Sequence, residues 1–153
     1  MWTFVDQTDL FVVTEYCSRG DLRKVIAELQ KLPEEEHLIR VWDLLTQIIL
    51  ALDHLHSRGV LHRDIKPENI FVMEDGSVRL GDFGLAKDMT QKDYATIAGT
   101  KLYMAAEVWA MKRMDFGTDV FAVGVVLFEL LTGRHPFEAD TIEGAIEKIR
   151  QGD

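Results

Sequence analysis

Residues 38–55 constrain the fold most strongly, because their apolar residues recur at the spacing of one helix face. The apolar positions are Leu38, Val41, Trp42, Leu45, Ile48, Ile49, Leu52 and Leu55. Pro33 and three glutamates precede this pattern and Gly59 follows it, which are ordinary signals for the start and end of a helix. The sequence therefore predicts a long amphipathic helix, with Trp42 and the leucines packed into a core.

Shorter elements are predicted before and after this helix. The run 10–13 is β-branched and aromatic, as is typical of a strand, and Asp21 is placed to cap a helix that reaches about Gln30. The strand-like runs 70–73 and 77–80 are joined by Glu74-Asp75-Gly76, and an Asp-Gly pair in such a place is a strong hairpin signal.

The second half of the chain is predicted to be mostly helical. Residues 84–107 have no clear periodicity and are predicted to form a long loop, which in compact domains is usually functional or disordered. Residues 118–132 are apolar on every side, so we expect a fully buried helix. Thr141 is placed to cap a last amphipathic helix over 142–149. These elements together indicate a single, mostly helical unit.

Composition excludes several classes of protein. The 153 residues suit one domain, and 26 acidic against 17 basic residues give a formal charge of −9, which argues against a nucleic-acid partner. A single cysteine, Cys17, excludes an internal disulfide and fits a reducing compartment. No signal peptide is visible, and the apolar run 118–132 is too short to span a bilayer and carries two acids, so no membrane partner is expected.

Two motifs flank the predicted hairpin. His62-Arg63-Asp64-Ile65-Lys66-Pro67-Glu68-Asn69 precedes it and Asp82-Phe83-Gly84 follows it, and together they resemble the catalytic and metal-binding loops of protein kinases. The resemblance implies an α+β, protein-kinase-like fold, mostly the helical C-terminal lobe with the hinge and the last strand of the N-terminal lobe. It implies a partial kinase domain over 1–153, with the end of the N-lobe at 1–16, the hinge at 15–22, an incomplete C-lobe at 23–153 and the activation segment at 82–107.

The resemblance also assigns chemistry to these loops, with ATP and Mg²⁺ as cofactors. Asp64 is expected to accept the proton of the substrate hydroxyl, and Lys66 to reach the transferred phosphate. Asn69 and Asp82 offer hard oxygen ligands suited to Mg²⁺. A lysine two residues after the aspartate resembles serine/threonine kinases rather than tyrosine kinases. Upstream, Thr14 would stand beside the nucleotide.

The hinge and the neighbouring loops have expected roles as well. The backbone groups of Glu15 and Cys17 would bind adenine, and Phe71 would form the floor under the base. His62 and Phe83 are assigned to packing against each other rather than to catalysis.

Three residues are expected to be regulatory. Kinases with an arginine at the position of Arg63 usually need phosphate on the activation loop. Thr96 is the first candidate for that phosphate, and Thr90 and Tyr94 are weaker ones. Thr100 is expected to hydrogen-bond the catalytic-loop aspartate and lysine and to help seat the substrate.

Finer detail is similar to the NIMA-related (NEK) kinases, in the segments 15–17, 20–22, 69–71 and 80–87. These are serine/threonine kinases linked to the cell cycle, centrosomes, microtubules and cilia. The likeness implies a protein substrate, possible cytoskeletal or cell-cycle partners, and an intracellular location that is cytoplasmic or cytoskeleton-associated.

The sequence departs from the kinase pattern in two ways. The 153 residues contain no Gly-rich loop, no phosphate-binding strand lysine and no glutamate partner for one, so we expect a truncated chain that is weakly active or inactive. The alternative is a catalytically silent binding or regulatory module. Ala105-Ala106-Glu107 also replaces the usual Ala-Pro-Glu, and we expect Glu107 to be exposed or its surroundings loosened.

Overall fold

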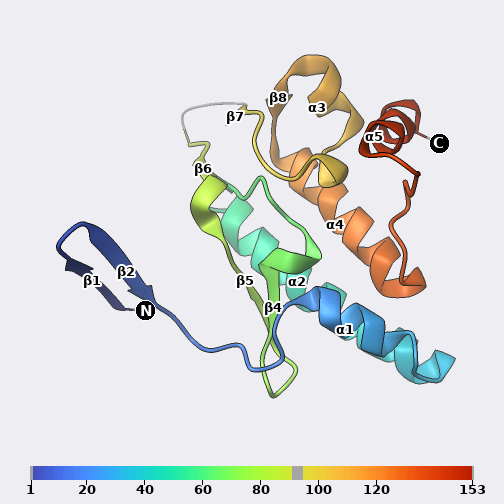
Figure 1. Ribbon diagram of the computed structural model, residues 1–153, viewed down its shortest axis with the longest axis horizontal. Coiled ribbons are helices and arrows are strands. Elements are labelled where there is room, and N and C mark those ends of the chain that lie inside the picture. The colour runs from blue at the N-terminus through green and yellow to red at the C-terminus, as the bar shows by residue number, and fades with distance from the viewer. Residues whose placement is uncertain (1, 91–94, 153) are drawn as a thin grey trace.

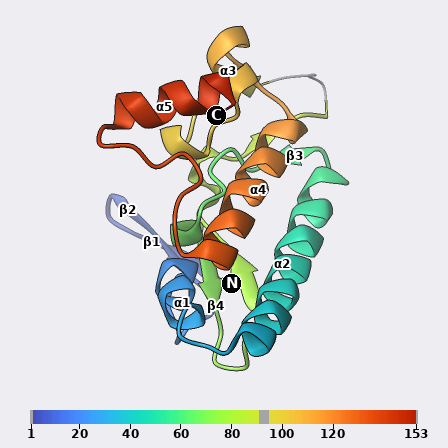
Figure 2. The ribbon, with the colours of Figure 1, turned by 90° about the vertical axis from the view of Figure 1, so that its right-hand side faces the viewer.

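The computed structural model describes residues 2–90 and 95–152, which form five α-helices and a set of short strands (Figure 1). The helices are α1 (Leu22–Leu29), α2 (Glu34–His56), α3 (Ala106–Met111), α4 (Phe116–Thr132) and α5 (Ile142–Gln151). Helices α2 and α4 pack against each other, and α1 packs at one end of α4 (Figure 2).

The strands pair two by two, always antiparallel. The pairs are β1 (Trp2–Asp6) with β2 (Asp9–Val13), β3 (Val60–Leu61) with β6 (Lys87–Asp88), β4 (Ile70–Val72) with β5 (Val78–Leu80), and β7 (Ala95–Thr96) with β8 (Arg113–Met114). Three short 3₁₀ turns complete the described elements: η1 (Pro67–Asn69), η2 (Phe83–Leu85) and η3 (Lys101–Tyr103).

The predicted boundaries of α1, α2 and α5 are close to the observed ones, and side-chain caps fix the starts of α1 and α5. Asp21 accepts a hydrogen bond from the backbone N–H of Lys24, and Thr141 accepts one from that of Gly144. Pro33 stands immediately before α2, whose first turn carries three glutamates, where they complement the helix dipole.

The prediction that Trp42 lies in the core is wrong. Its side chain is 61% exposed, whereas the neighbouring Val41 is fully buried. Consecutive residues differ by about 100° around a helix, and α2 packs on α4 and β5 through a face that excludes Trp42. The residues that face the core are Val41, Leu44, Leu45, Ile48 and Leu52.

The prediction that the 118–132 helix is fully buried is also wrong. Helix α4 leaves Val120, Phe128 and Leu131 exposed on one side. Its other side is buried and includes two acids, Asp119 and Glu129, each at most 2% exposed. The apolar composition of α4 therefore gave a wrong prediction both for its exposed apolar residues and for its buried acids.

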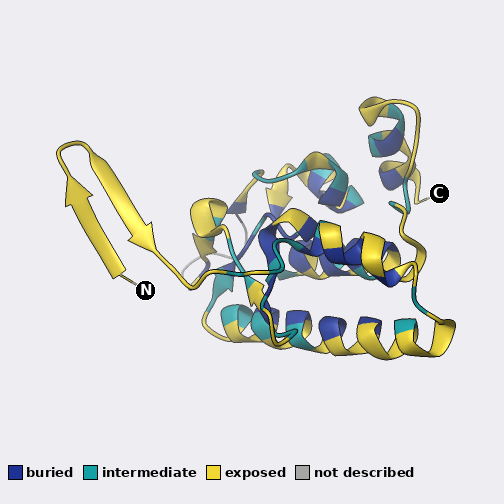
Figure 3. Cartoon of the chain, turned by 60° about the horizontal axis from the view of Figure 1, so that its bottom comes forward, coloured by how far each residue is buried: buried dark blue, intermediate teal, exposed yellow. Residues whose placement is uncertain are grey.

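The strand predicted at 10–13 is present as β2, and it pairs with an unpredicted strand, β1. Every residue of this hairpin is exposed, and it stands apart from the helices (Figure 3). The rings of Phe4 and Phe11 stack across it with their centroids 4.8 Å apart.

The β4–β5 hairpin forms as predicted and links the first half of the chain to the second. The segment before α1 runs along β4, because Arg19 N donates to Val72 O at 3.2 Å and Val72 N donates to Gly20 O at 2.9 Å. Residues 84–107 are less irregular than predicted, since they contain η2, β6, β7, η3 and the start of α3. Among the described residues, no helix is both long and apolar enough to cross a membrane.

Candidate active site

Asp64 is the centre of a polar network that joins the 64–69 loop to Thr100. It follows β3 and is 7% exposed. Its Oδ2 accepts hydrogen bonds from Lys66 Nζ at 2.8 Å and from Asn69 Nδ2 at 2.9 Å. Its Oδ1 accepts from the Thr100 hydroxyl at 2.7 Å and from Thr100 N at 2.8 Å. Lys66 Nζ also donates to the Thr100 hydroxyl at 2.8 Å, so the contacts expected of Thr100 are present.

This network keeps Asp64 ionised. Burial alone would raise the pKa of its carboxyl group, but the hydrogen bonds from Lys66 and Thr100 outweigh burial and hold the pKa below its ordinary value. Asp64 is therefore a carboxylate at neutral pH, with a positive charge 2.8 Å away at Lys66.

Asp119 accepts hydrogen bonds from the backbone of the loop that leads to Asp64. Its Oδ2 accepts a hydrogen bond from His62 N and its Oδ1 accepts one from Arg63 N, both at 2.9 Å. The Nε2 atom of His56 lies 2.9 Å from Oδ2 of Asp119. Arg63 has a left-handed backbone with φ of 71°, which is strained for a residue with a side chain. Asp119 therefore fixes an unfavourable turn directly before Asp64, a role that sequence reasoning missed.

His62 connects the two motif loops. Its Nδ1 accepts from Asp64 N at 3.3 Å and its Nε2 lies 3.1 Å from Gly81 O, which requires the neutral ring with the proton on Nε2. Burial lowers the pKa of His62, although the nearby acids oppose this effect. The ring also packs against Phe83, with centroids 5.1 Å apart, as expected.

Two oxygen donors adjoin this network, from Asn69 and Asp82. Gly81 N donates to Asn69 O at 2.9 Å, which holds the two loops side by side. Both hydrogen bonds of the Asn69 side chain use Nδ2, so its carbonyl Oδ1 is turned away from Asp64. Asp82 is exposed, has a left-handed backbone with φ of 57°, and uses Oδ1 to accept from Gly84 N at 3.3 Å.

These donors fit Mg²⁺, which takes few protein oxygens and keeps several waters. Within the part of the chain that the structure describes, no group of three or more His, Cys, Asp or Glu side chains is placed to hold a metal ion. One amide oxygen and one carboxylate suit Mg²⁺ better than they suit zinc, which prefers nitrogen and sulfur ligands.

A pocket of about 660 Å³ lies beside the 14–21 segment. The residues predicted around adenine, Thr14, Glu15, Cys17 and Phe71, all line it. The Glu15 carboxylate forms a 2.9 Å ion pair with Arg79, and both side chains are largely exposed. The structure therefore brings these residues together around one cavity.

A glycine explains how Phe71 approaches the 81–84 loop. A Cβ on Gly81 would lie 2.8 Å from the Phe71 ring, so a larger residue would push the ring away. Phe71 thus connects the pocket to the loop that carries Asp82.

The Arg63 guanidinium is held by backbone carbonyls of residues 82–107. It donates to Leu85 O and, at 3.1 Å, to Thr96 O. Thr96 and Thr90 are exposed, whereas Tyr94, the other predicted phosphorylation site, lies outside the described residues.

Gly99 is required where residues 95–100 cross the 62–64 loop. Its φ is +106°, and a Cβ on it would lie 2.0 Å from Arg63 O. The close approach brings the next residue, Thr100, onto Asp64.

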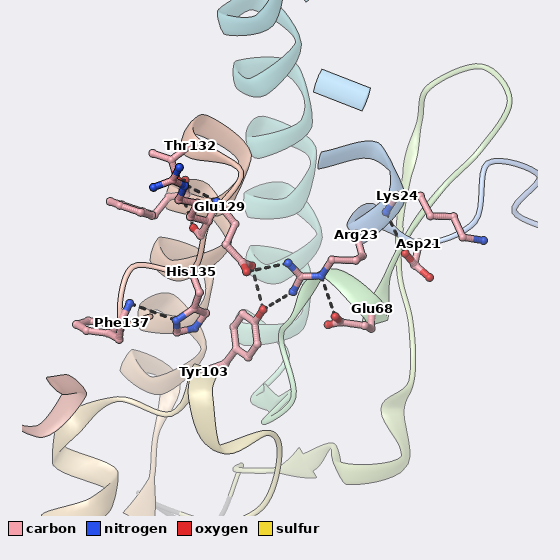
Figure 4. A network of polar contacts seen from close by, with 11 residues as sticks. Asp21, Arg23, Lys24, Glu68, Tyr103, Glu129, Thr132, His135 and Phe137 are labelled. Carbon is pink, nitrogen blue, oxygen red and sulfur yellow. Dashed lines mark hydrogen bonds and ion pairs between the residues drawn. The ribbon is translucent and has the colours of Figure 1, made fainter. Parts of the chain in front are cut away.

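A second network was not found from sequence and surrounds Arg23 on α1 (Figure 4). Arg23 donates to Glu68 Oε1 at 2.9 Å, to Glu129 Oε1 at 2.8 Å and to the Tyr103 hydroxyl at 2.6 Å. The Tyr103 hydroxyl donates to Glu129 Oε2 at 2.9 Å. The only sequence signal was an acid, Glu129, inside the apolar run 118–132.

This second network perturbs its own titratable groups. Burial and the Glu129 charge raise the pKa of Tyr103. Burial opposes the charged form of Arg23, but the hydrogen bonds that Arg23 donates to Glu129 and Glu68 outweigh it and raise the pKa of the guanidinium. The network ties α1 and α4 to the segments that carry Asn69 and Thr100.

Glu107 lies in the Ala105-Ala106-Glu107 segment, which replaces the usual Ala-Pro-Glu. It is exposed, as expected.

The fold and this arrangement of loops define a protein kinase domain: residues 1–152 match that family, and the chain belongs to it. The α+β, kinase-like fold predicted from the motifs is thereby confirmed.

Among known proteins, the chain is similar to NIMA-related kinases. It is 39% identical to mouse serine/threonine-protein kinase Nek1 over 98% of the chain and 12% of that protein. It is 40% identical to human Nek5 over 97% of the chain and 21% of that protein. It is 36% identical to the G2-specific protein kinase nimA of Emericella nidulans over 94% of the chain and 25% of that protein. The chain therefore spans about a quarter or less of the length of these relatives.

Proposed function

We propose that the chain carries the phosphate-transfer site of a serine/threonine protein kinase, which moves the γ-phosphate of ATP to a serine or threonine hydroxyl of a protein. The observation that carries the proposal is the Asp64 carboxylate, held ionised by Lys66 and Thr100 at 2.7 to 2.8 Å. The serine/threonine type is supported by the similarity to mouse Nek1, which is a serine/threonine-protein kinase.

Asp64 would orient the substrate hydroxyl and accept its proton as the oxygen bonds to the γ-phosphorus and ADP leaves. The depressed pKa of Asp64 makes it a weak base, so its main contributions are orientation and late acceptance of the proton. The Lys66 ammonium would stabilise the charge on the transferred phosphate. The Thr100 hydroxyl already lies between these two groups, which supports the fit of an aliphatic hydroxyl there.

Asn69 and Asp82 would hold Mg²⁺, which neutralises phosphate charge when bound. The adenine would occupy the 660 Å³ pocket, with the backbone of Glu15 and Cys17 along its edge, Phe71 beneath it and Thr14 beside it. This assignment is supported by the convergence of all four residues on one cavity.

The remaining expectations form part of the same proposal. The boundaries are the N-lobe end at 1–16, the hinge at 15–22, the C-lobe at 23–153 and the activation segment at 82–107. Phosphate on Thr96 would compete with the backbone carbonyls for Arg63, which supports a regulatory role for both residues.

We also propose cell-cycle or cytoskeletal partners and an intracellular location, cytoplasmic or cytoskeleton-associated. The support is similarity to a protein named a G2-specific kinase.

The test combines nucleotide binding with phosphate transfer. MgATP added to the ¹⁵N-labelled chain should shift the amide signals of Cys17, Phe71 and Asp82. At high chain concentration, labelled ATP should phosphorylate a serine peptide but not the same peptide with tyrosine. Transfer is expected to be weak, because the 153 residues contain no Gly-rich loop or strand lysine to cover the phosphates.

Asp64→Asn should lower transfer about 10²-fold or more, while Asp53→Asn, an exposed carboxylate on α2, should leave it unchanged. MgATP shifts without any Asp64-dependent transfer would contradict phosphate transfer and favour the silent binding module. Absence of MgATP shifts would contradict the nucleotide site itself.

A further inference from the structure

A pocket of about 490 Å³ adjoins the Asp64 network. Three residues that belong to that network, Lys66, Asn69 and Thr100, contribute to its lining. Successive residues of an extended chain are about 3.3–3.6 Å apart, so two residues on either side of a phosphate acceptor reach about 7 Å from it. A protein substrate whose hydroxyl lies at Asp64 therefore has flanking residues within reach of this pocket.

Two carboxylates also line this pocket, Glu68 in η1 and Glu129 in α4. The side chain of Glu129 is 3% exposed and that of Glu68 is 47% exposed. A pair of carboxylates in such a place would by itself attract a lysine or arginine of the substrate. A buried carboxylate without a donor is costly, so the group that satisfies Glu129 decides which residues the pocket accepts.

The chain's own Arg23 already occupies this acidic position (Figure 4). Its Nε donates to Glu68 Oε1 at 2.9 Å, and its Nη1 donates to Glu129 Oε1 at 2.8 Å. Its Nη2 donates to the Tyr103 hydroxyl at 2.6 Å, and that hydroxyl donates to Glu129 Oε2 at 2.9 Å. All three nitrogens of the guanidinium and both oxygens of Glu129 are therefore engaged within the chain.

The charges that line the pocket are balanced. Arg23 and Lys66 offset the two glutamates. Burial raises the pKa of Tyr103 and lowers the pKa of His135, so neither ring adds a charge at neutral pH. A substrate arginine would have to displace Arg23 from Glu129, which exchanges one ion pair for an equal one, or else lie beside two cations. An uncharged side chain meets neither obstacle.

We propose that Arg23 determines the substrate specificity of the chain: it fills the acidic pocket beside the phosphate-transfer site, so that the chain accepts uncharged residues near the serine or threonine and gains nothing from arginine or lysine there. This inference rests on the proposed function, because it concerns the protein substrate of the same site. Removing Arg23 should release the two carboxylates and create a preference for basic substrates.

The probes are two peptides, acetyl-Arg-Ala-Ser-Ala-Arg-amide and the same peptide with glutamine in place of both arginines. Arginine on both sides of the serine makes the test independent of the direction in which the peptide binds. Each is titrated into the ¹⁵N-labelled chain at about 0.15 M salt, where distant surface charges are largely screened, and the amides of Thr100 and Leu102 are followed. The parent chain should bind the two peptides with dissociation constants within about twofold of each other.

Arg23→Gln should raise the preference for the arginine peptide about tenfold, because the released carboxylates can then pair with it. Arg58→Gln is the matched control: it removes the same charge from an exposed position just after α2 and should change the preference less than twofold. Adding Glu68→Gln and Glu129→Gln to Arg23→Gln removes the released carboxylates. The preference should then return to within about twofold of the parent value, although the contact between α1 and α4 is equally lost.

Circular dichroism reports whether Arg23→Gln folds. If it does not, Arg23→Lys takes its place, because one ammonium cannot match the fork that holds both glutamates, and it should raise the preference about threefold. A tenfold preference for arginine in the parent, an unchanged preference in the folded Arg23 variant, or a gain that persists in the triple variant would overturn the inference. The proposed function fails separately, in the MgATP and Asp64→Asn tests, which leave Arg23 unchanged.

Discussion

Replacing Asp119 with alanine tests how the structure holds the loop that carries Asp64. Asp119 is 1% exposed, and its two oxygens accept the backbone hydrogens of His62 and Arg63, each at 2.9 Å. Alanine offers no acceptor, so both amide hydrogens would be left buried and unpaired. Each such group costs about 1–3 kcal/mol, which gives about 2–6 kcal/mol for the pair, apart from the lost His56 contact. A domain of this size is stable by only about 5–15 kcal/mol.

The control is Asp115→Ala, at the start of the same helix. Asp115 caps α4 by accepting from Gly117 N at 2.9 Å and is exposed, so its loss should cost about 1 kcal/mol. Both variants remove one carboxylate from α4, but only Asp119→Ala leaves buried donors unsatisfied. The difference between the two variants therefore isolates the support of the loop from helix capping.

The measurement is urea unfolding followed by far-ultraviolet circular dichroism, with the free energy of unfolding extrapolated to water. Native-state amide exchange adds a local readout, because protection at His62 and Arg63 should fall about tenfold for each 1.4 kcal/mol lost. The reasoning is refuted if Asp119→Ala destabilises the chain no more than Asp115→Ala, or if exchange at these two amides is unchanged.

Gly99→Ala should destabilise the chain by at least about 2 kcal/mol, because its φ is +106° and the new methyl group would meet a carbonyl oxygen. Gly124→Ala in α4 should instead stabilise it by about 0.5–1 kcal/mol, since nothing lies within 4 Å of the new methyl group; equal effects in urea unfolding would contradict this account. His62 is buried in its neutral form with a lowered pKa, so its contribution to stability should be complete above the unfolded pKa of about 6.5 and lost as the pH falls below it. The free energy of unfolding, measured at pH 7.5 and 5.5, should fall less on acidification in His62→Gln than in the parent chain. The difference should reach up to about 1.4 kcal/mol per pH unit. An identical pH dependence in the two chains would disprove the assignment.

Local sequence patterns predicted four of the five described helices, α1, α2, α4 and α5, and the strands β2, β4 and β5. Asp21 and Thr141 mark helix starts at which the side chain accepts a first-turn backbone N–H. Pro33 marks the start of α2 through its fixed φ, without a side-chain cap. The Asp75-Gly76 pair predicted the β4–β5 hairpin, because it favours the backbone conformation of a tight turn. These signals succeed because they involve residues only a few positions apart.

The two motifs, found in the expected order, predicted the protein family, which the periodicity of apolar residues could not do. His62 to Asn69 and Asp82 to Gly84 predicted a kinase-like domain, which the family match confirms. The expected contacts of Thr100 were correct as well, although 36 residues separate it from Asp64. That expectation came from resemblance to a family rather than from the physics of the chain.

Burial was decided only by the tertiary structure. Trp42 and Val120 occupy apolar patterns yet are exposed, while Asp119 and Glu129 interrupt one and are buried. Periodicity shows which residues share a helix face, but not whether another element covers that face.

The sequence by itself thus determined most of the helices, the β4–β5 hairpin and the family. The tertiary structure decided which buried acids hold the site together. Asp119 meets a loop 57 residues before it, and Glu129 meets Arg23 at a separation of 106 residues. A buried carboxylate is stable only where donors from elsewhere in the chain converge on it, and that convergence exists only once the helices and loops have packed.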